Sequence, residues 1–268
     1  MPHGRVFDES QKKRGKIIVC LFGDSVVREK VAPEYLENEY EYTDDHWDHF
    51  HQLRTIAQPV LKALQPYSPL IHGSIARGDT TKKSDIDVII SHQVKEFQIN
   101  LAMDSLNYTP SERWIVQATP LSAIKGVILF SISPELSVTF PLIPFYPREY
   151  EFYSFGGVLD SNSLKERINK RVPGVNKQLL FIEPTENGHK EYRVTSDNAN
   201  IIAKILNISI DTVLERLRVL ERRNEKGRTG IFKKRLVAPT EAFGEVLKKI
   251  AESDPASRRR IRRKKVPK

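Results

Sequence analysis

The segment from Pro69 to Ile90, PLIHGSIARGDTTKKSDIDVII, constrains the fold more than any other part of this chain. Its apolar ends predict two β-strands, the second running from about Ile86 to Ile90. Between them lie a Gly-Ser turn and a short segment that ends at Gly78. A fold that contains a sheet is therefore required, with this glycine-bounded connection joining two of its strands.

The residue types in the connection suit phosphate binding. Gly73 has no Cβ and lets the backbone approach a ligand closely. Ser74 can cap the short helix that follows, and amides at a helix start bind phosphate. Arg77, one turn later, carries a planar donor group that matches phosphate oxygens. A lone Gly-Ser or Arg-Gly pair marks an ordinary turn, so the argument depends on the whole ordered pattern.

Asp85 and Asp87 are separated by one residue on the second predicted strand. Alternate side chains of a strand share one face, which places the two Cα atoms ~6.6 Å apart. Both carboxylates could then reach a pair of Mg²⁺ ions ~3.5–4 Å apart, the arrangement used in two-metal phosphoryl transfer. Mg²⁺ also prefers oxygen ligands combined with substrate phosphates. A phosphate turn and paired carboxylates therefore make chemical sense together.

In this order, GSIARGDTTKKSDID resembles the signature of the DNA polymerase β superfamily of nucleotidyltransferases, a GS…RG…(S/T)D-x-D pattern. With EFYSFGG, RVPGVNKQLLFIEPT and a C-terminal helix-turn-helix, the chain also resembles archaeal predicted nucleotidyltransferases. The resemblance implies transfer of an NMP from an NTP to an acceptor hydroxyl, with two Mg²⁺ or Mn²⁺ ions. It implies that Asp85 and Asp87 are catalytic metal ligands, and that the nucleotide is bound by Gly73, Ser74, Arg77 and Ser84. Arg77 either binds phosphate or braces the helix.

One departure from the superfamily pattern concerns a third carboxylate, which usually lies on a later strand and helps to activate the acceptor hydroxyl. The expected strand here, Leu136 to Phe145, contains no Asp or Glu, and Thr139 or a neighbour takes the position. Glu135, just before the strand, is the candidate replacement, and Asp104 is a more distant one. Without such a group the acceptor hydroxyl has no evident general base.

Along the whole chain the sequence predicts an α+β fold. A nucleotidyltransferase-type mixed sheet with flanking helices is followed by a smaller winged helix-turn-helix domain and a basic tail. A helix capped by Thr43 should run to about Leu64, because apolar residues recur at spacings of three and four. The predicted strands cover 17–22, 113–117, 124–132 and 136–145. The prolines of the last one predict an edge or irregular strand. The predicted divisions are a basic segment 1–16, a nucleotidyltransferase domain 17–155, a winged helix-turn-helix domain 156–252 and a disordered tail 253–268.

The C-terminal third reads as a helix over 198–206, a tight turn, and a second helix that begins at Ser209. NEKGRTGIFKKRLV should form a glycine-turned hairpin, the wing, before a last helix over 241–251. The exposed face of the second helix is acidic in its first turns, which are the turns that read the major groove in such domains. Phosphate contact by the wing and the tail is therefore favoured over base reading, the other interpretation being a domain used for packing or dimerisation.

The net charge of +9 is concentrated at the C-terminus, because residues 255–268 carry eight Lys/Arg and no acid, which leaves +1 for residues 1–254. A basic run of this density binds polyanions in a salt-dependent way, or simply improves solubility. The predicted nucleic-acid contacts are Arg222, Arg223, Lys226, Arg228, Lys233, Lys234, Arg258, Arg259, Arg260, Arg262 and Arg263.

Several classes of protein are excluded by simpler features. The longest apolar run, Ile17 to Phe22, has six residues, far fewer than the ~20 that span a bilayer. The N-terminus has no apolar core of a secretory signal, and the single cysteine, Cys20, cannot form an internal disulfide. These features predict a cytoplasmic protein. His46, His49 and His51 lie on the first helix without patterned acids or cysteines, which favours surface imidazoles over a metal site.

Three functions compete on this sequence. The favoured one is a Mg²⁺-dependent nucleotidyltransferase that acts on a nucleic-acid end, with RNA favoured over DNA. The alternative is a nucleotide-sensing, nucleic-acid-binding regulator whose catalytic centre has degenerated, which the missing third carboxylate suggests. A third possibility retains the transfer but uses a protein hydroxyl as the acceptor.

Overall fold

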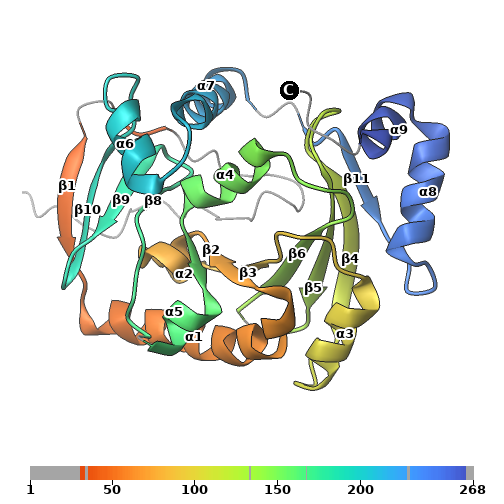
Figure 1. The fold of residues 1–268 in the computed structure, drawn as a ribbon. Helices are drawn as coiled ribbons and strands as arrows, with labels where there is room; N and C mark the ends of the chain where they lie inside the picture. The colour runs from red at the N-terminus through yellow and green to blue at the C-terminus, as the bar shows by residue number, and fades with distance from the viewer. Residues whose placement is uncertain (1–30, 34–35, 133, 167, 228–229, 264–268) are drawn as a thin grey trace, which may run out of the picture.

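The structure is a computed structural model that describes residues 31–33, 36–132, 134–166, 168–227 and 230–263. The strand predicted over 17–22, with Cys20, and the basic segment 1–16 lie outside these residues. The described residues form two sheets surrounded by helices, a mixed α+β architecture (Figure 1). No helix among them is long and apolar enough to cross a membrane.

The larger sheet has seven strands and mixes parallel and antiparallel pairs. In spatial order its strands are β11 (Lys233–Leu236), β4 (Pro110–Gln117), β5 (Ile124–Phe130), β6 (Leu136–Pro141), β3 (Ile86–Ile89), β2 (Leu70–His72) and β7 (Val158–Asp160). The smaller sheet is antiparallel, in the order β1 (Glu37–Glu41), β10 (Gly188–Arg193), β9 (Leu180–Pro184) and β8 (Gly174–Val175).

Helices pack against both sheets, and Figure 1 shows α1 and α5 along one side of the larger sheet and α8 and α9 beyond β11. Between β1 and β8 the chain forms α1 (Asp44–Ala63), α2 (Ser74–Arg77), α3 (Glu96–Asp104), α4 (Pro147–Gly156) and α5 (Ser161–Glu166), with a 3-10 turn at Gln65–Tyr67. After β10 it forms α6 (Ala199–Leu206), α7 (Ile210–Lys226), α8 (Phe243–Ser253) and α9 (Pro255–Arg262).

The prediction for α1 is confirmed. The Thr43 side chain accepts a hydrogen bond from the His46 backbone N–H, and acidic residues occupy the first turn, where the helix dipole favours them. The apolar stripe, which includes Phe50, Leu53 and Val60, is fully buried. Side chains of this helix hold the segment that contains the signature in place.

The prediction that 136–145 is an edge or irregular strand is wrong. β6 lies in the interior of the sheet between β5 and β3, and every one of its residues is buried. The only proline within it, Pro141, is its last residue, where a missing N–H costs little, and the other prolines lie outside the strand. Residues 136–140 can therefore form the backbone hydrogen bonds of an interior strand.

The predicted helices of the C-terminal third are present, but the wing is not formed as a hairpin in the described residues. Ser209 caps α7 by accepting from the Thr212 N–H, and Asn207 turns the chain in the left-handed conformation. Lys233 to Leu236 instead pairs antiparallel with β4, as β11. Strands β7 and β11, both from the segment assigned to the second domain, thus extend the sheet of the first.

The prediction that 253–268 is a disordered tail is wrong for residues 255–262, which form α9. Ser257 is fully buried and donates to the Gln117 side chain at 2.7 Å. Arg260 is 2% exposed and donates to the backbone oxygens of Leu121 and Pro144 and to Glu149. These hydrogen bonds hold a basic segment in a folded helix, although its composition alone predicts a solvated tail.

Asp254 joins α8 to α9, and its charge should stabilise this corner. Its carboxylate accepts from Ser257, ion-pairs with Lys233 and caps α9, and these contacts hold the pKa of Asp254 below its ordinary 3.8. Because the folded pKa is depressed, the stabilisation is complete above the unfolded value and disappears as pH falls through the folded one. We expect Asp254→Ala to cost about 1 kcal/mol near neutral pH. Urea denaturation along a pH series should show this difference shrinking below pH 3.8, and a constant difference would contradict the assignment.

Candidate active site

The glycine turn predicted from the sequence connects the end of β2 to α2. Gly73 has φ +80°, a conformation that L side chains rarely adopt, and its N–H donates to Gly157 O at 3.0 Å. The carbonyl of Gly73 accepts from the N–H groups of Ala76 and Arg77. The turn therefore directs the start of α2, with the Ser74 side chain, toward the beginning of β3.

Ser84 lies at the other end of the loop and closes it. Its hydroxyl accepts from the Thr81 N–H at 2.9 Å and from the Ser74 hydroxyl at 3.1 Å, and the residue is only 5% exposed. Two hydroxyls that are ten positions apart in the sequence thus lie side by side next to Asp85.

Asp87 lies on β3 and is half-buried. It lies in register with Ser137 on β6 and His72 on β2, and the Ser137 hydroxyl donates to its Oδ1 at 2.7 Å. Desolvation raises the pKa of Asp87, against the opposing effects of the Ser137 hydrogen bond and the charges of Lys177 and Lys125. Asp85 immediately precedes the same strand, two residues from Asp87.

Arg77 is engaged by the protein itself. Its Nε and Nη2 donate to the two carboxylate oxygens of Asp79 at 3.0 and 2.9 Å, and Nη1 donates to Gly156 O at 2.5 Å. The side chain is nearly buried. Of the two roles left open by the sequence, this geometry supports bracing of α2 against the end of α4.

On β6, Ser137 is the residue that pairs with Asp87. The same parallel register places Glu135, just before β6, opposite Asp85, and Ile86 N–H donates to Glu135 O at 2.8 Å. Burial and then the charges of Asp87 and Glu112 raise the pKa of Glu135. Thr139 lies further along β6, and Asp104 is an exposed residue at the end of α3. Of the two candidate carboxylates, Glu135 is therefore the one that the strand register brings to the start of β3.

The donor set suits a divalent cation held with the help of substrate. Asp85 and Asp87 offer hard oxygen ligands, and the Asp87 carboxylate accepts a hydrogen bond from the neutral Ser137 hydroxyl. Within the described residues no group of three His, Cys, Asp or Glu side chains is gathered closely enough to hold an ion by itself. Mg²⁺ is commonly bound by one or two carboxylates together with substrate phosphates.

The histidines of α1 hold the loop that leads to Asp85. His46 Nε2 donates to Gly78 O and His49 Nε2 to Thr81 O, each at 2.8 Å. Burial is the main cause that lowers the pKa of His46. A hollow of about 310 Å³ adjoins this loop, between β1, β10 and Thr80. These imidazoles therefore position the loop through its backbone carbonyls.

Sequence reasoning missed three residues near Asp87. His72 precedes Gly73, and burial followed by the charges of Arg77, Lys125 and Lys177 lowers its pKa to about 3, so the ring is neutral. Lys125 on β5 donates to the Tyr153 hydroxyl at 3.1 Å. Only the alternation of β2 and β5 could have indicated that His72 and Lys125 share a face with Asp87, and no local pattern indicates Lys177.

The predicted nucleic-acid contacts divide into two groups. Arg260 is buried, Lys233 pairs with Asp254, Lys234 lies 4.2 Å from the centre of the Trp114 ring, and Arg258 donates to the carbonyls of Ala251 and Glu252. Arg228 lies outside the described residues. The exposed members are Arg222, Arg223, Lys226, Arg259, Arg262 and Arg263. Including Arg260 among the contacts was wrong, because its guanidinium is used inside the protein.

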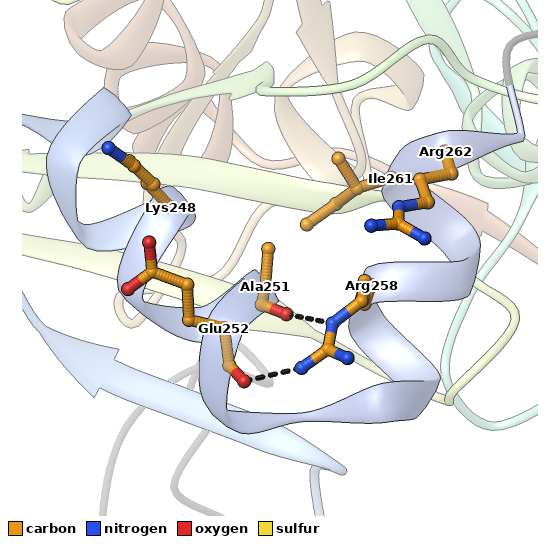
Figure 2. Close-up of a pocket in the computed structure, with 6 residues that line it drawn as sticks. All are labelled: Lys248, Ala251, Glu252, Arg258, Ile261 and Arg262. Atoms are coloured by element: carbon orange, nitrogen blue, oxygen red, sulfur yellow. Dashed lines mark hydrogen bonds between the residues drawn. The ribbon is translucent and has the colours of Figure 1, made fainter.

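A basic hollow separates α8 from α9. Figure 2 shows Lys248, Arg258 and Arg262 around it, with Ala251 and Ile261 contributing apolar atoms. The Arg258 guanidinium is held by the C-terminal carbonyls of α8, which fixes one wall (Figure 2). The exposed cations of α9 therefore belong to a helix that is anchored to the larger sheet.

The first turns of α7 are occupied by α4. Arg148 ion-pairs with Asp211 and Glu215, and Glu151 accepts from the hydroxyls of Ser209 and Thr212. A recognition helix uses these turns to contact base edges. The arrangement supports the packing interpretation of this helix pair.

Comparison with known proteins bears on the segment that contains the signature. No curated protein matches the chain. Residues 53–121 match the family model described as a nucleotidyltransferase domain. The matched region includes the Gly73 turn, Asp85 and Asp87, and ends before β5. The predicted signature thus lies within a nucleotidyltransferase domain match, in a mixed α+β fold consistent with that assignment.

Proposed function

We propose that this protein is a metal-dependent nucleotidyltransferase that transfers an NMP from an NTP to an acceptor hydroxyl. The observation that carries the proposal is the convergence of the Gly73–Ser74 turn with Asp85 and Asp87 on one face of β3. This convergence occurs within the region that matches the nucleotidyltransferase domain.

Each residue has a defined part in this proposal. Asp85 and Asp87 would hold two Mg²⁺ or Mn²⁺ ions, which supply Lewis-acid stabilisation of phosphate charge. The backbone at Gly73 and the hydroxyls of Ser74 and Ser84 orient the phosphates. The acceptor oxygen forms a bond to the α-phosphorus, the bond to the bridging oxygen breaks, and pyrophosphate leaves. Glu135 would take the proton of the acceptor.

A nucleic-acid end is the acceptor that the surface charge favours, and RNA is our first choice. The exposed cations of α9 and of the C-terminal turn of α7 provide phosphate contacts without base reading. Because such contacts are sequence-independent, we expect acceptor binding to weaken steeply with salt.

The test is incubation with each α-labelled NTP, Mg²⁺ or Mn²⁺, and separate pools of RNA, DNA and protein. We expect label on RNA with wild-type protein and none with Asp85→Asn. Asp197→Asn, which neutralises an exposed aspartate, is the matched control and should transfer label normally. Equal transfer by wild type and Asp85→Asn would refute the proposal, and label on protein would move the acceptor to a protein hydroxyl.

A nucleotide-sensing regulator is the second candidate, and Ser137 is the observation that favours it. A hydroxyl faces Asp87 where the superfamily usually has a third carboxylate. For a regulator we expect NTP to change the affinity for nucleic acid without any labelled product. Metal-dependent transfer that is lost in Glu135→Gln would instead show that Glu135 replaces the missing group.

A further inference from the structure

The proposed function requires positive charge beside the phosphates of the bound nucleotide. This inference rests on that function, which requires a triphosphate to lie beside Asp85 and Asp87. Arg77, the arginine of the signature, uses Nε, Nη1 and Nη2 in hydrogen bonds to Asp79 and Gly156. Helix α2 has only four residues, so few peptide dipoles are aligned at its start. Lysines on the elements that pack around this site are therefore candidates for phosphate binding.

Lys125 reaches the site from β5. Its Nζ donates to the Tyr153 hydroxyl and lies 5.4 Å from the centre of that ring. The Tyr153 ring in turn packs edge-on against His72 at 5.4 Å between centroids. His72 is the register partner of Asp87. A short chain of contacts thus connects the Lys125 ammonium to the face that carries the catalytic carboxylates.

Lys177 reaches the same region from the smaller sheet. A Cβ on Gly174 would lie 2.6 Å from Gly157 N, so only glycine allows β8 to approach this closely. Gly157 O accepts from Gly73 N–H, which fixes β8 against the phosphate turn. Lys177 follows β8 by two residues and is exposed. The sequences EFYSFGG and RVPGVNKQ therefore bring β8 against the Gly73 turn, with Lys177 three residues beyond the Gly174–Gly157 contact.

We propose that Lys125 and Lys177 bind the β- and γ-phosphates of the NTP and balance the charge of pyrophosphate as it leaves. Lys125 lies on β5 of the larger sheet, and Lys177 lies between β8 and β9 of the smaller sheet. Both lie outside the matched residues 53–121. When the bond between the α-phosphorus and its bridging oxygen breaks, the electron pair stays on pyrophosphate, where preorganised cations are most effective.

The test compares ligands that differ only in their phosphates. Calorimetry would measure the affinity for a non-hydrolysable NTP analogue with Mg²⁺ and, separately, for the matching NMP. The proteins compared are wild type, Lys125→Met, Lys177→Met and the double variant. We expect each single variant to bind the NTP analogue roughly 10-fold more weakly and the double variant roughly 100-fold, since a hydrogen bond to a charged group is lost each time. Affinity for the NMP should stay within about 2-fold.

Arginine variants and a distant lysine complete the design. Lys125→Arg and Lys177→Arg should recover most of the NTP affinity, because the charge is retained. Lys190→Met, which removes an exposed lysine of β10, should leave binding unchanged. Unchanged NTP affinity in the double variant, or equal losses for NTP and NMP, would overturn this inference alone. Failure of the wild-type protein to bind any NTP would overturn the proposed function as well.

Discussion

Asp87→Asn should abolish nucleotidyl transfer while making the folded protein slightly more stable. The amide cannot hold a divalent cation as a carboxylate does, and losing one centre of transition-state stabilisation typically costs about 10²–10³-fold in rate. The stability gain follows from burial, since desolvation raises the pKa of Asp87 and shows that the charged form is disfavoured in its place. The Ser137 hydroxyl can still donate to the amide oxygen. We expect a gain of about 1 kcal/mol in metal-free buffer.

Label transfer and urea denaturation in the presence of a chelator would measure the two effects on the same preparation. Asp197→Asn, which neutralises an exposed aspartate, is the control and should change neither quantity. A variant that loses activity and stability together would indicate that Asp87 has a structural role instead.

Arg54→Met should destabilise the protein by about 3 kcal/mol, the largest effect on stability that we expect from one side chain. Arg54 is fully buried on α1, with its guanidinium 4.6 Å from the centre of the Phe50 ring. It donates to the backbone oxygens of Ile75 and Ala76 on α2, and to those of residues 168 and 170. Burial lowers the pKa of Arg54 to about 9, so the group is still charged at neutral pH. Methionine would fill the space but leave four carbonyls without this donor.

Chemical denaturation should compare Arg54→Met with Arg54→Lys and with Lys62→Met, an exposed change on the same helix. Lysine retains the charge but lacks the planar fork, so it should recover only part of the loss. Lys62→Met should stay within about 0.5 kcal/mol of wild type. A fully stable Arg54→Met protein would mean that water can replace the guanidinium at α2.

Local patterns predicted the parts of the fold that depend on neighbouring residues. The cap at Thr43 and the apolar stripe of α1 are encoded within one helix, and Ser209 similarly marks the start of α7. Strand alternation likewise predicts that Asp85 and Asp87 share one face, because both belong to one segment. These features need no knowledge of distant partners.

The missed features all depend on pairing between distant segments. Ser137 faces Asp87 because β6 pairs in parallel with β3. The prolines near β6 instead predict an edge or irregular strand, which would not have two such neighbours. The basic segment of α9 is folded because Arg260 donates hydrogen bonds to carbonyl oxygens on loops that lie more than 100 residues away in the sequence. Lys177 joins the site through β8, whose pairing belongs to a separate sheet.

The strand pairings also impose an order on how this chain can mature during synthesis. β1 (Glu37–Glu41) pairs with β10, and β4 pairs with β11 (Lys233–Leu236), so each sheet joins an early strand to a late one. Contacts of such large sequence separation form slowly, because a long loop must close first. Neither edge can be completed until the ribosome has released residues 188–193 and 233–236. A nascent chain that stalls before residue 233 would expose the β4 edge, the kind of unpaired strand that chaperones protect from aggregation.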